Sequence, residues 1–182
     1  KRQVVPSLHL FRPGVAKPKI IELPSENYSD VGSLAVADID GDGDLDVFVA
    51  GQSVPGRFPV AASSWLLRCG SAGLELDKKQ SSTFANVGMV TAAVFAQLDS
   101  DPFPELVIAT EWGPVRIFKN SAGTFTDVTK EWGLDQKLGL WQTLAAGDFN
   151  NDGRLDIMAG NWGLNSHLKH LSLIHISEPT RP

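Results

Sequence analysis

The chain has a single cysteine, Cys69, so no disulfide bond can form within it, and one thiol alone does not indicate the redox compartment. No apolar run approaches the roughly 18 residues of a transmembrane helix. Basic residues form no cluster and the net charge is −5, so nothing favours binding to nucleic acid. A Ser-His-Asp set, a glycine-rich phosphate loop and a CxxC pair are all missing. The sequence therefore gives no signal for a disulfide scaffold, a membrane-spanning helix, a nucleic-acid partner or a common type of catalytic site.

Acidic residues are instead concentrated in two short segments. Residues 38–46 carry a carboxylate at every second position, and residues 148–156 repeat this pattern with small changes. Two like charges at roughly 4 Å repel each other by about 1 to 4 kcal/mol, so such a cluster favours a bound cation. Oxygen donors at alternate positions suit a hard ion such as Ca²⁺, and a glycine at the sixth position (Gly43, Gly153) permits the positive φ of a tight loop. We predict two calcium-binding loops; the alternative is an acidic turn that is merely solvated.

An EF-hand does not account for these loops. That motif needs a bidentate glutamate at the twelfth position of the loop, where this chain has Val49 and Ala159. An EF-hand loop also joins two helices, whereas the flanking segments here are short and rich in valine, isoleucine and phenylalanine. Such runs are typical of strands. Each acidic segment is therefore expected to form the turn of a β-hairpin.

A third, altered copy of the acidic segment lies between the other two, at residues 97–105. The copies start at residues 38, 97 and 148, so successive starts are 59 and 51 residues apart. A second landmark, an apolar run that ends in a basic residue, recurs at Arg12, Arg68 and Lys119. Repeats of about 40 to 50 residues with four strands each are typical of propeller blades.

The sequence thus predicts an all-β fold: a partial β-propeller with about three four-stranded antiparallel blades in an incomplete ring. No amphipathic helix is expected. The predicted units are the outer strands of a preceding blade (1–30), a blade with an intact calcium loop (31–90), a blade with a degenerate loop (91–140), and the start of a further blade with an intact calcium loop (141–170).

The end of the chain differs in character from the repeats. Residues 171–182 resemble the in-frame translation of a sequencing-library adapter and are interpreted as not native, although 171–176 would also suit an ordinary strand. The chain begins with Lys1 in the middle of a repeat rather than with methionine. We therefore interpret it as a piece of a longer protein, shortened at both ends.

A set of motifs occurs together in this chain: residues 36–47, 54–59, 117–120, 123–129 and 161–165. Together they resemble the FG-GAP/VCBS repeat propellers, which are related in architecture to the integrin α-chain head, and more narrowly the bacterial relatives of cartilage acidic protein. The literal Phe-Gly and Gly-Ala-Pro pairs that name the family are absent. The resemblance implies a secreted or surface-exposed propeller that is stabilised by calcium and serves in adhesion, in recognition, or as a domain beside an enzyme.

The resemblance also implies the metal ligands. Asp44 and Arg154, at the seventh position of each intact loop, would contribute backbone carbonyls. The remaining ligands would be side-chain oxygens, from Asp38, Asp40, Asp42, Asp46, Asp148, Asn150, Asp152 and Asp156.

The middle loop departs from this pattern. Gln97 replaces the first aspartate and Pro102 replaces the glycine. Because proline is fixed near a φ of −65°, this loop cannot take the same turn. Its remaining acids, Asp99, Asp101 and Glu105, are weaker candidates for a metal site.

The leading functional hypothesis is a non-catalytic calcium-binding module for extracellular recognition or adhesion. It would lie outside the cell, at its surface or in the periplasm, and bind an unknown protein or carbohydrate. The alternative is the propeller domain of a secreted carbohydrate-active enzyme, a lyase or hydrolase, whose catalytic residues lie elsewhere. The innermost strands expected here, 34–37, 92–96 and 144–147, are small and apolar, which argues against chemistry in a central channel.

Aromatic residues leave two interpretations open. Trp112, Trp132 and Trp162 are each followed by glycine, which suits either a sugar-binding platform or packing at the ends of blades. The segment 51–59, with Arg57 and Phe58, is either a ligand-binding loop or an ordered cover over the edge of a blade.

Overall fold

The computed structural model describes residues 6–24 and 29–163. The segment 171–182, interpreted as adapter-derived, lies outside this part of the chain, as does the end of the last predicted blade. No helix within the described ranges is long and apolar enough to cross a membrane.

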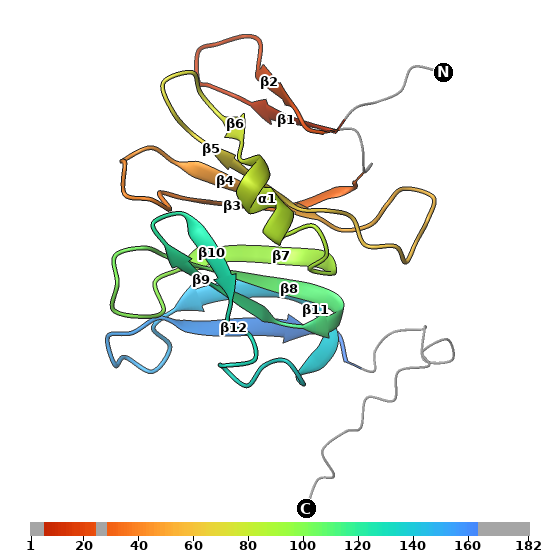
Figure 1. Cartoon of the computed structure of the whole chain (residues 1–182), viewed down its shortest axis with the longest axis vertical. Helices are drawn as coiled ribbons and strands as arrows, with labels where there is room; N and C mark the ends of the chain where they lie inside the picture. The colour runs from red at the N-terminus through yellow and green to blue at the C-terminus, as the bar shows by residue number, and fades with distance from the viewer. Residues whose placement is uncertain (1–5, 25–28, 164–182) are drawn as a thin grey trace, which may run out of the picture.

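The regular structure is almost entirely antiparallel β-sheet (Figure 1). β1 (Ser7–Leu10) and β2 (Lys19–Glu22) form a two-stranded hairpin. The next sheet has four strands paired in chain order: β3 (Val31–Ala37), β4 (Asp46–Gly51), β5 (Trp65–Arg68) and β6 (Glu75–Leu76). The third sheet contains β7 (Met89–Ala96), β8 (Glu105–Pro114), β9 (Arg116–Ser121) and β10 (Thr124–Asp127), again paired in chain order, followed by β11 (Leu138–Gly147) and β12 (Asp156–Asn161).

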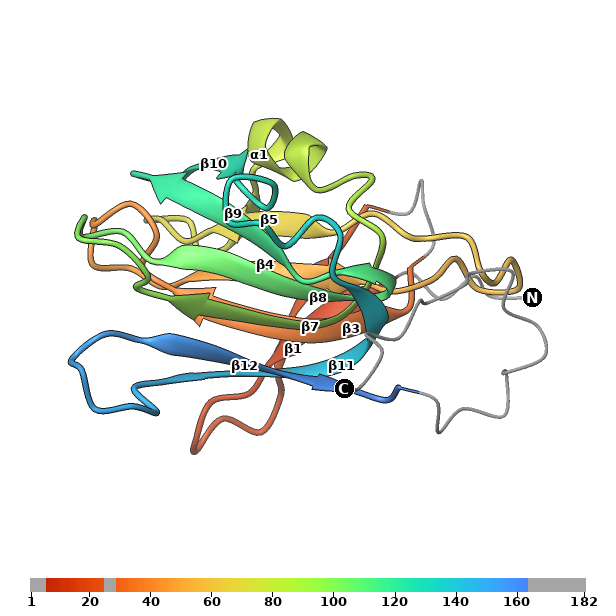
Figure 2. The same ribbon diagram turned by 90° about the horizontal axis from the view of Figure 1, so that it is seen from below.

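The predicted fold class, an all-β partial propeller, is confirmed. The four-stranded units lie face to face in Figure 1, and the three acidic segments project from the same end of the stack in both Figure 1 and Figure 2. This arrangement follows from the repeat, because equivalent turns of stacked sheets fall at the same end.

Alternate residues of each strand face different neighbours, as the period of two requires. In β4, Phe48 and Ala50 belong to the apolar cluster between the β3–β6 sheet and the β7–β10 sheet. Val47 and Val49, from the same strand, face the β1–β2 hairpin. In β8, Val107 faces the opposite side of its sheet and packs toward β11 and β12. Each interface between units is therefore a closed apolar layer built from one face of every strand.

One short helix was not predicted. α1 (Lys78–Thr83) follows β6, and the Asp77 side chain caps it by accepting a hydrogen bond from the backbone N–H of Gln80 at 2.9 Å. With six residues the helix shows no 3.6-residue periodicity, so the expectation of no helix was wrong for lack of a signal. Phe84 follows directly after the helix, is fully buried, and lies in the interface between the β3–β6 sheet and the β7–β10 sheet.

The second and third repeats are joined by more than side-chain packing. The first part of β11 pairs with the end of β8, with Leu138 opposite Pro114 and Leu140 opposite Glu111. Trp112 is skipped in this register and has a φ of +58°, which is typical of the extra residue in a bulge. The innermost strand expected here began only at residue 144, whereas β11 begins at Leu138 and its register with β12 shifts between Trp141 and Thr143.

Candidate metal sites

Each acidic segment joins the first and second strands of its repeat, as predicted. Residues 38–46 connect β3 to β4, residues 97–105 connect β7 to β8, and residues 148–156 connect β11 to β12. The strands on either side fix the ends of each turn, so the geometry of the loop depends on its own side chains.

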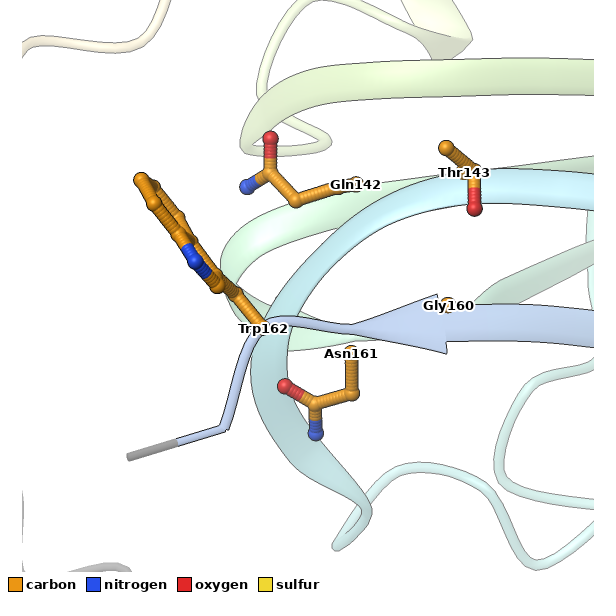
Figure 3. A pocket seen from close by; sticks show the side chains of 5 residues that line it. All are labelled: Gln142, Thr143, Gly160, Asn161 and Trp162. Atoms are coloured by element: carbon orange, nitrogen blue, oxygen red, sulfur yellow. The ribbon is translucent and has the colours of Figure 1, made fainter. Parts of the chain in front are cut away.

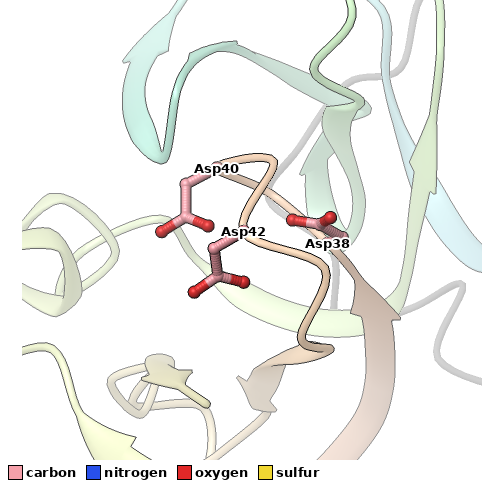
Figure 4. A group of neighbouring side chains, drawn as sticks. All are labelled: Asp38, Asp40 and Asp42. Carbon is pink, nitrogen blue, oxygen red and sulfur yellow. The ribbon is translucent and has the colours of Figure 1, made fainter. Parts of the chain in front are cut away.

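In the first loop, Asp38, Asp40 and Asp42 converge (Figure 4). Each offers one carboxylate oxygen, and these oxygens lie within 4.8 Å of one another. Asp38 accepts the backbone N–H groups of Gly41 at 2.7 Å and Gly43 at 3.0 Å, so it shapes the loop from within. The Oδ1 atom of Asp40 is buried and has no hydrogen-bond partner. A cluster with an unused buried acceptor is suited to holding a cation.

Asp46 occupies a different position from the other acids of the first loop. It is 1% exposed, and its two oxygens accept the backbone N–H groups of Cys69 at 2.8 Å and Ile39 at 3.4 Å. Burial raises the pKa of Asp46, and the two backbone hydrogen bonds oppose that shift. Asp46 therefore fastens the base of the loop to β5. The side chain of Asp44 is exposed, and its N–H donates to Asp42 at 2.8 Å.

The third loop repeats the internal bonds of the first. Asp148 accepts the N–H groups of Gly153 at 2.8 Å and Asp152 at 3.1 Å. The pKa of Asp148 is lowered, chiefly by the bond from Gly153. Asp152 accepts the N–H of Arg154 at 2.9 Å, just as Asp42 accepts that of Asp44.

The other predicted ligands of the third loop form hydrogen bonds with one another and with the backbone at the base of the loop. Asn150 donates its side-chain amide to Asp152 at 3.0 Å, and Asp156 accepts the N–H of Phe149 at 3.1 Å. Within the described ranges, three or more acidic side chains converge only in the first and middle loops. The structure thus brings the residues of the third loop into one turn, in which Asn150 takes the place that Asp40 has in the first loop.

In the middle loop, Asp99, Asp101 and Glu105 also lie with one oxygen each within 4.8 Å. Glu105 is 1% exposed, and its Oε2 atom accepts the N–H of Leu98 at 2.9 Å, as Asp46 does with Ile39. Its Oε1 atom is buried without a partner. Burial raises the pKa of Glu105. Gly43, whose position Pro102 takes in the middle loop, has a φ of +88°, which proline cannot adopt.

Two basic residues contact the acidic loops of their own repeats. Arg68, at the end of β5, pairs with Asp40 and also contacts Asp77 at 3.2 Å. Lys119, in β9, pairs with Asp99 at 2.5 Å and lies 3.4 Å from Asp101. The hydrogen bond from Lys119 lowers the pKa of Asp99. These are the same basic landmarks that mark the repeat in the sequence, where nothing indicated that they reach back to the loops.

The first loop is also tied to the next sheet. The amide nitrogen of Asn120, which is fully buried, donates to the carbonyl of Ile39 at 2.9 Å and to that of Pro104 at 3.1 Å. A guanidinium nitrogen of Arg68 donates to the carbonyl of Gly123 at 2.6 Å. The first loop is therefore hydrogen-bonded to β9, and Arg68, which pairs with it, is bonded to the turn between β9 and β10.

A second concave feature lies at the far end of β11 and β12 (Figure 3), where Gln142, Thr143, Gly160, Asn161 and Trp162 line a depression. Trp162 is 47% exposed and Trp132 is 48% exposed. Trp112 instead packs against Phe58, with ring centroids 5.4 Å apart in an edge-to-face arrangement. Trp112 thus packs against the 51–59 segment, while Phe58, which is 58% exposed, and the two exposed tryptophans keep both interpretations open.

The stacked antiparallel sheets with acidic first turns define a class of repeat. Residues 97–159 match the family model of the FG-GAP-like repeat, which confirms the resemblance drawn from the motifs. The match spans the middle loop and the third loop.

Two curated relatives are both cartilage acidic protein 1. The protein of Xenopus tropicalis is 42% identical over 53 residues, which is 29% of this chain and 8% of the relative. The protein of Mus musculus is 34% identical over 79 residues, 43% of this chain and 12% of the relative. The matched part of the chain thus spans about a tenth of the length of these relatives.

A solved structure, described as that of a Xanthomonas type IV secretion system related protein, covers 89% of this chain and 76% of its own. Its TM-score is 0.35 and its sequence identity is 16%, so it adds nothing to the fold or the site.

Proposed function

We propose that this chain is part of a calcium-stabilised β-propeller that serves recognition or adhesion outside the cell and has no catalytic role. The proposal is carried by the convergence of Asp38, Asp40 and Asp42 in a turn between two strands. The FG-GAP-like repeat match and the similarity to cartilage acidic protein 1 support a recognition module. The proposed blades are the units at 31–90 and 91–140, with 1–30 and 141–170 belonging to neighbouring blades.

The proposed ligands follow the two intact loops. The first site would use the side chains of Asp38, Asp40, Asp42 and Asp46 with the carbonyl of Asp44. The second would use Asp148, Asn150, Asp152 and Asp156 with the carbonyl of Arg154. Carboxylates, amide oxygens and carbonyls are the donors that Ca²⁺ takes in a flexible site, whereas Mg²⁺ demands a stricter octahedron.

Calcium would act here through stability. Removing a cation from three converging carboxylates restores their mutual repulsion, so the loop and the hairpin that it closes are favoured by the bound ion. Extracellular calcium modules bind with a Kd of about 10⁻⁴ to 10⁻³ M. At a free concentration of about ten times Kd, one site stabilises the folded state by about 1.4 kcal/mol.

The inner edges of the sheets support a non-catalytic role. β3, β7 and β11 lie side by side and are joined by hydroxyl groups: Ser33 accepts the N–H of Ala93 at 3.2 Å, and Thr91 donates to the carbonyl of Trp141 at 2.8 Å. In these two contacts the polar side chains are used to join one repeat to the next. Nothing specific in the described residues favours the alternative of an enzyme domain.

Calorimetric titration with calcium tests the proposal. We expect one equivalent of calcium per intact loop, and the loss of one equivalent in each of Asp42→Asn and Asp152→Asn. Asparagine keeps the oxygen that accepts the N–H of Asp44 or Arg154, so the turn is preserved while the charge is removed. Asp135→Asn, a half-buried acid outside the loops, serves as the control. Absence of calcium binding by the unaltered chain, or full retention in the double variant, would refute the proposal.

A further inference from the structure

The middle loop, residues 97–105, contains its own cation. We propose that the ammonium group of Lys119 occupies the place of the metal in this loop, so that the second repeat is held without calcium. The Nζ atom lies 2.5 Å from Asp99 and 3.4 Å from Asp101, the two acids at the third and fifth positions of the loop. This inference stands whether or not the other two loops bind calcium.

Two substitutions in the middle loop remove both the donor and the acceptor of one hydrogen bond. In the intact loops, the N–H at the sixth position donates to the carboxylate at the first position: Gly43 to Asp38 at 3.0 Å, and Gly153 to Asp148 at 2.8 Å. Pro102 has no N–H to donate, and Gln97 has no carboxylate to accept it. Because the donor and the acceptor are lost together, the two substitutions indicate a turn with a different charge balance rather than an isolated change at one position.

Gln97 also changes the character of the loop interior. Its side-chain nitrogen donates to the carbonyl of Asp99 at 3.2 Å and to the carbonyl of Asp101. In the intact loops the first position supplies a carboxylate. An amide that presents its nitrogen offers a hydrogen-bond donor, where a hard cation needs an oxygen.

The bonds that shape the hairpin itself are kept. Asp101 accepts the N–H of Phe103 at 2.9 Å, as Asp42 does with Asp44. Glu105 accepts the N–H of Leu98 at the base of the loop. The middle loop therefore keeps these two closing bonds, lacks the bond between its sixth and first positions, and has a different group to neutralise its acids.

Arg68, the equivalent basic residue of the first repeat, differs from Lys119 in how it contacts its loop. The guanidinium of Arg68 is shared among three partners. It pairs with Asp40 in its own loop and with Asp77 at the start of α1, and it donates to the carbonyl of Gly123 in the next sheet. The three-way contact leaves Oδ1 of Asp40 without a partner. Lys119 places one compact charge between two carboxylates, as a metal ion would.

The buried, unpartnered Oε1 atom of Glu105 defines the competing outcome. If a metal joined Asp99, Asp101 and Glu105, this oxygen would bind it, and Lys119 would be displaced. The two hypotheses predict different effects of removing Lys119. If Lys119 neutralises Asp99 and Asp101, its loss leaves their charges uncompensated; if a metal neutralises them, their charges stay compensated.

The experiment uses the chain with Asp42→Asn and Asp152→Asn, so that the intact loops contribute no response. Thermal unfolding is followed in EDTA and in millimolar calcium, with and without Lys119→Met, which removes the ammonium group and keeps the aliphatic stem. We expect no calcium-dependent shift while Lys119 is present, a lower midpoint in EDTA for Lys119→Met, and recovery of that loss in calcium. Lys130→Met, at an exposed position, is the matched control and should show neither effect.

Two results would overturn the inference. One is a calcium-dependent rise in the midpoint while Lys119 is intact that disappears in Asp99→Asn with Asp101→Asn. The other is a Lys119→Met variant that behaves in EDTA like Lys130→Met. Should the combined variants fail to fold, calcium titration of the otherwise unaltered chain with Asp99→Asn and Asp101→Asn gives the same decision, since we expect no loss of calcium equivalents.

Discussion

Asp46 has two roles, as a proposed calcium ligand and as the residue that holds the base of the first loop, and one substitution measured without calcium separates them. As a proposed ligand it should matter only when calcium is present, but the structure also makes it the fastener of the first loop. Asp46→Ala removes the acceptor for the N–H of Cys69 at 2.8 Å and for that of Ile39 at 3.4 Å. Leaving a buried N–H without a partner costs about 1 to 3 kcal/mol, and the longer bond to Ile39 contributes the smaller share. Relief from burying a charge offsets part of this loss, so we expect a net destabilisation of about 2 kcal/mol.

The assay is equilibrium unfolding in urea with EDTA, so that no metal contributes. Asp44→Ala is the matched control, because it lies in the same loop, has an exposed side chain and uses only its backbone N–H. We expect Asp46→Ala to unfold at a distinctly lower urea concentration than Asp44→Ala. Equal stability of the two variants in EDTA would refute the assignment of Asp46 as a structural fastener and leave only its role as a ligand.

The pH dependence gives a second readout for the same residue. Because the pKa of folded Asp46 is raised above its usual value of 3.8, the folded state holds this proton more tightly than the unfolded state does. The resulting stability is present below pH 3.8 and is lost as the pH rises through the raised pKa. Asp46→Asn carries no charge, so its stability relative to the unaltered chain should improve over this interval. A constant difference across the interval would contradict the raised pKa.

Two further predictions concern the interface between the β3–β6 and β7–β10 sheets and the first acidic loop. Phe84→Ala removes a fully buried ring that packs edge-to-face on three others, with centroids 5.1 to 5.6 Å apart, and should cost about 3 to 5 kcal/mol in urea unfolding. Phe11→Ala, whose ring is 74% exposed, is its control, and equal effects of the two would contradict the core assignment. Arg68→Met frees Asp40 and should tighten calcium binding in calorimetry while lowering stability in EDTA; weaker calcium binding would show that the guanidinium assists the site.

Local patterns in the sequence were sufficient for the hairpins. Strands were predicted on both sides of each acidic turn, and β4 and β8 follow the first two turns as expected. A strand of this kind is determined by neighbouring residues, since β-branched and aromatic side chains suit a pleated surface and glycine or aspartate ends it. The acidic turns follow for the same reason, because each loop is shaped by bonds between residues at most seven positions apart.

Elements without a local pattern were missed. α1 is too short to show a helical period, and its place depends on contacts with other strands: the Ser81 hydroxyl accepts the N–H of Leu66 at 3.0 Å, and the Gln80 side chain accepts that of Phe125 at 3.1 Å. The pairing of β11 with β8 depends on a bulge at Trp112, for which a single tryptophan before glycine gives no clear sign.

By itself, the sequence determined the class of fold, the repeat and the three acidic turns, because strands and turns depend on neighbouring residues and the repeat on the recurrence of that local pattern every 51 to 59 residues. Only the tertiary structure decided which charges meet. Asn120 bonds to Ile39 across 81 residues, Arg68 reaches Gly123 across 55, and Lys119 lies 20 residues beyond Asp99. Such pairs depend on how stacked sheets bring their ends together, and the balance of charge within each loop is therefore a property of the folded chain.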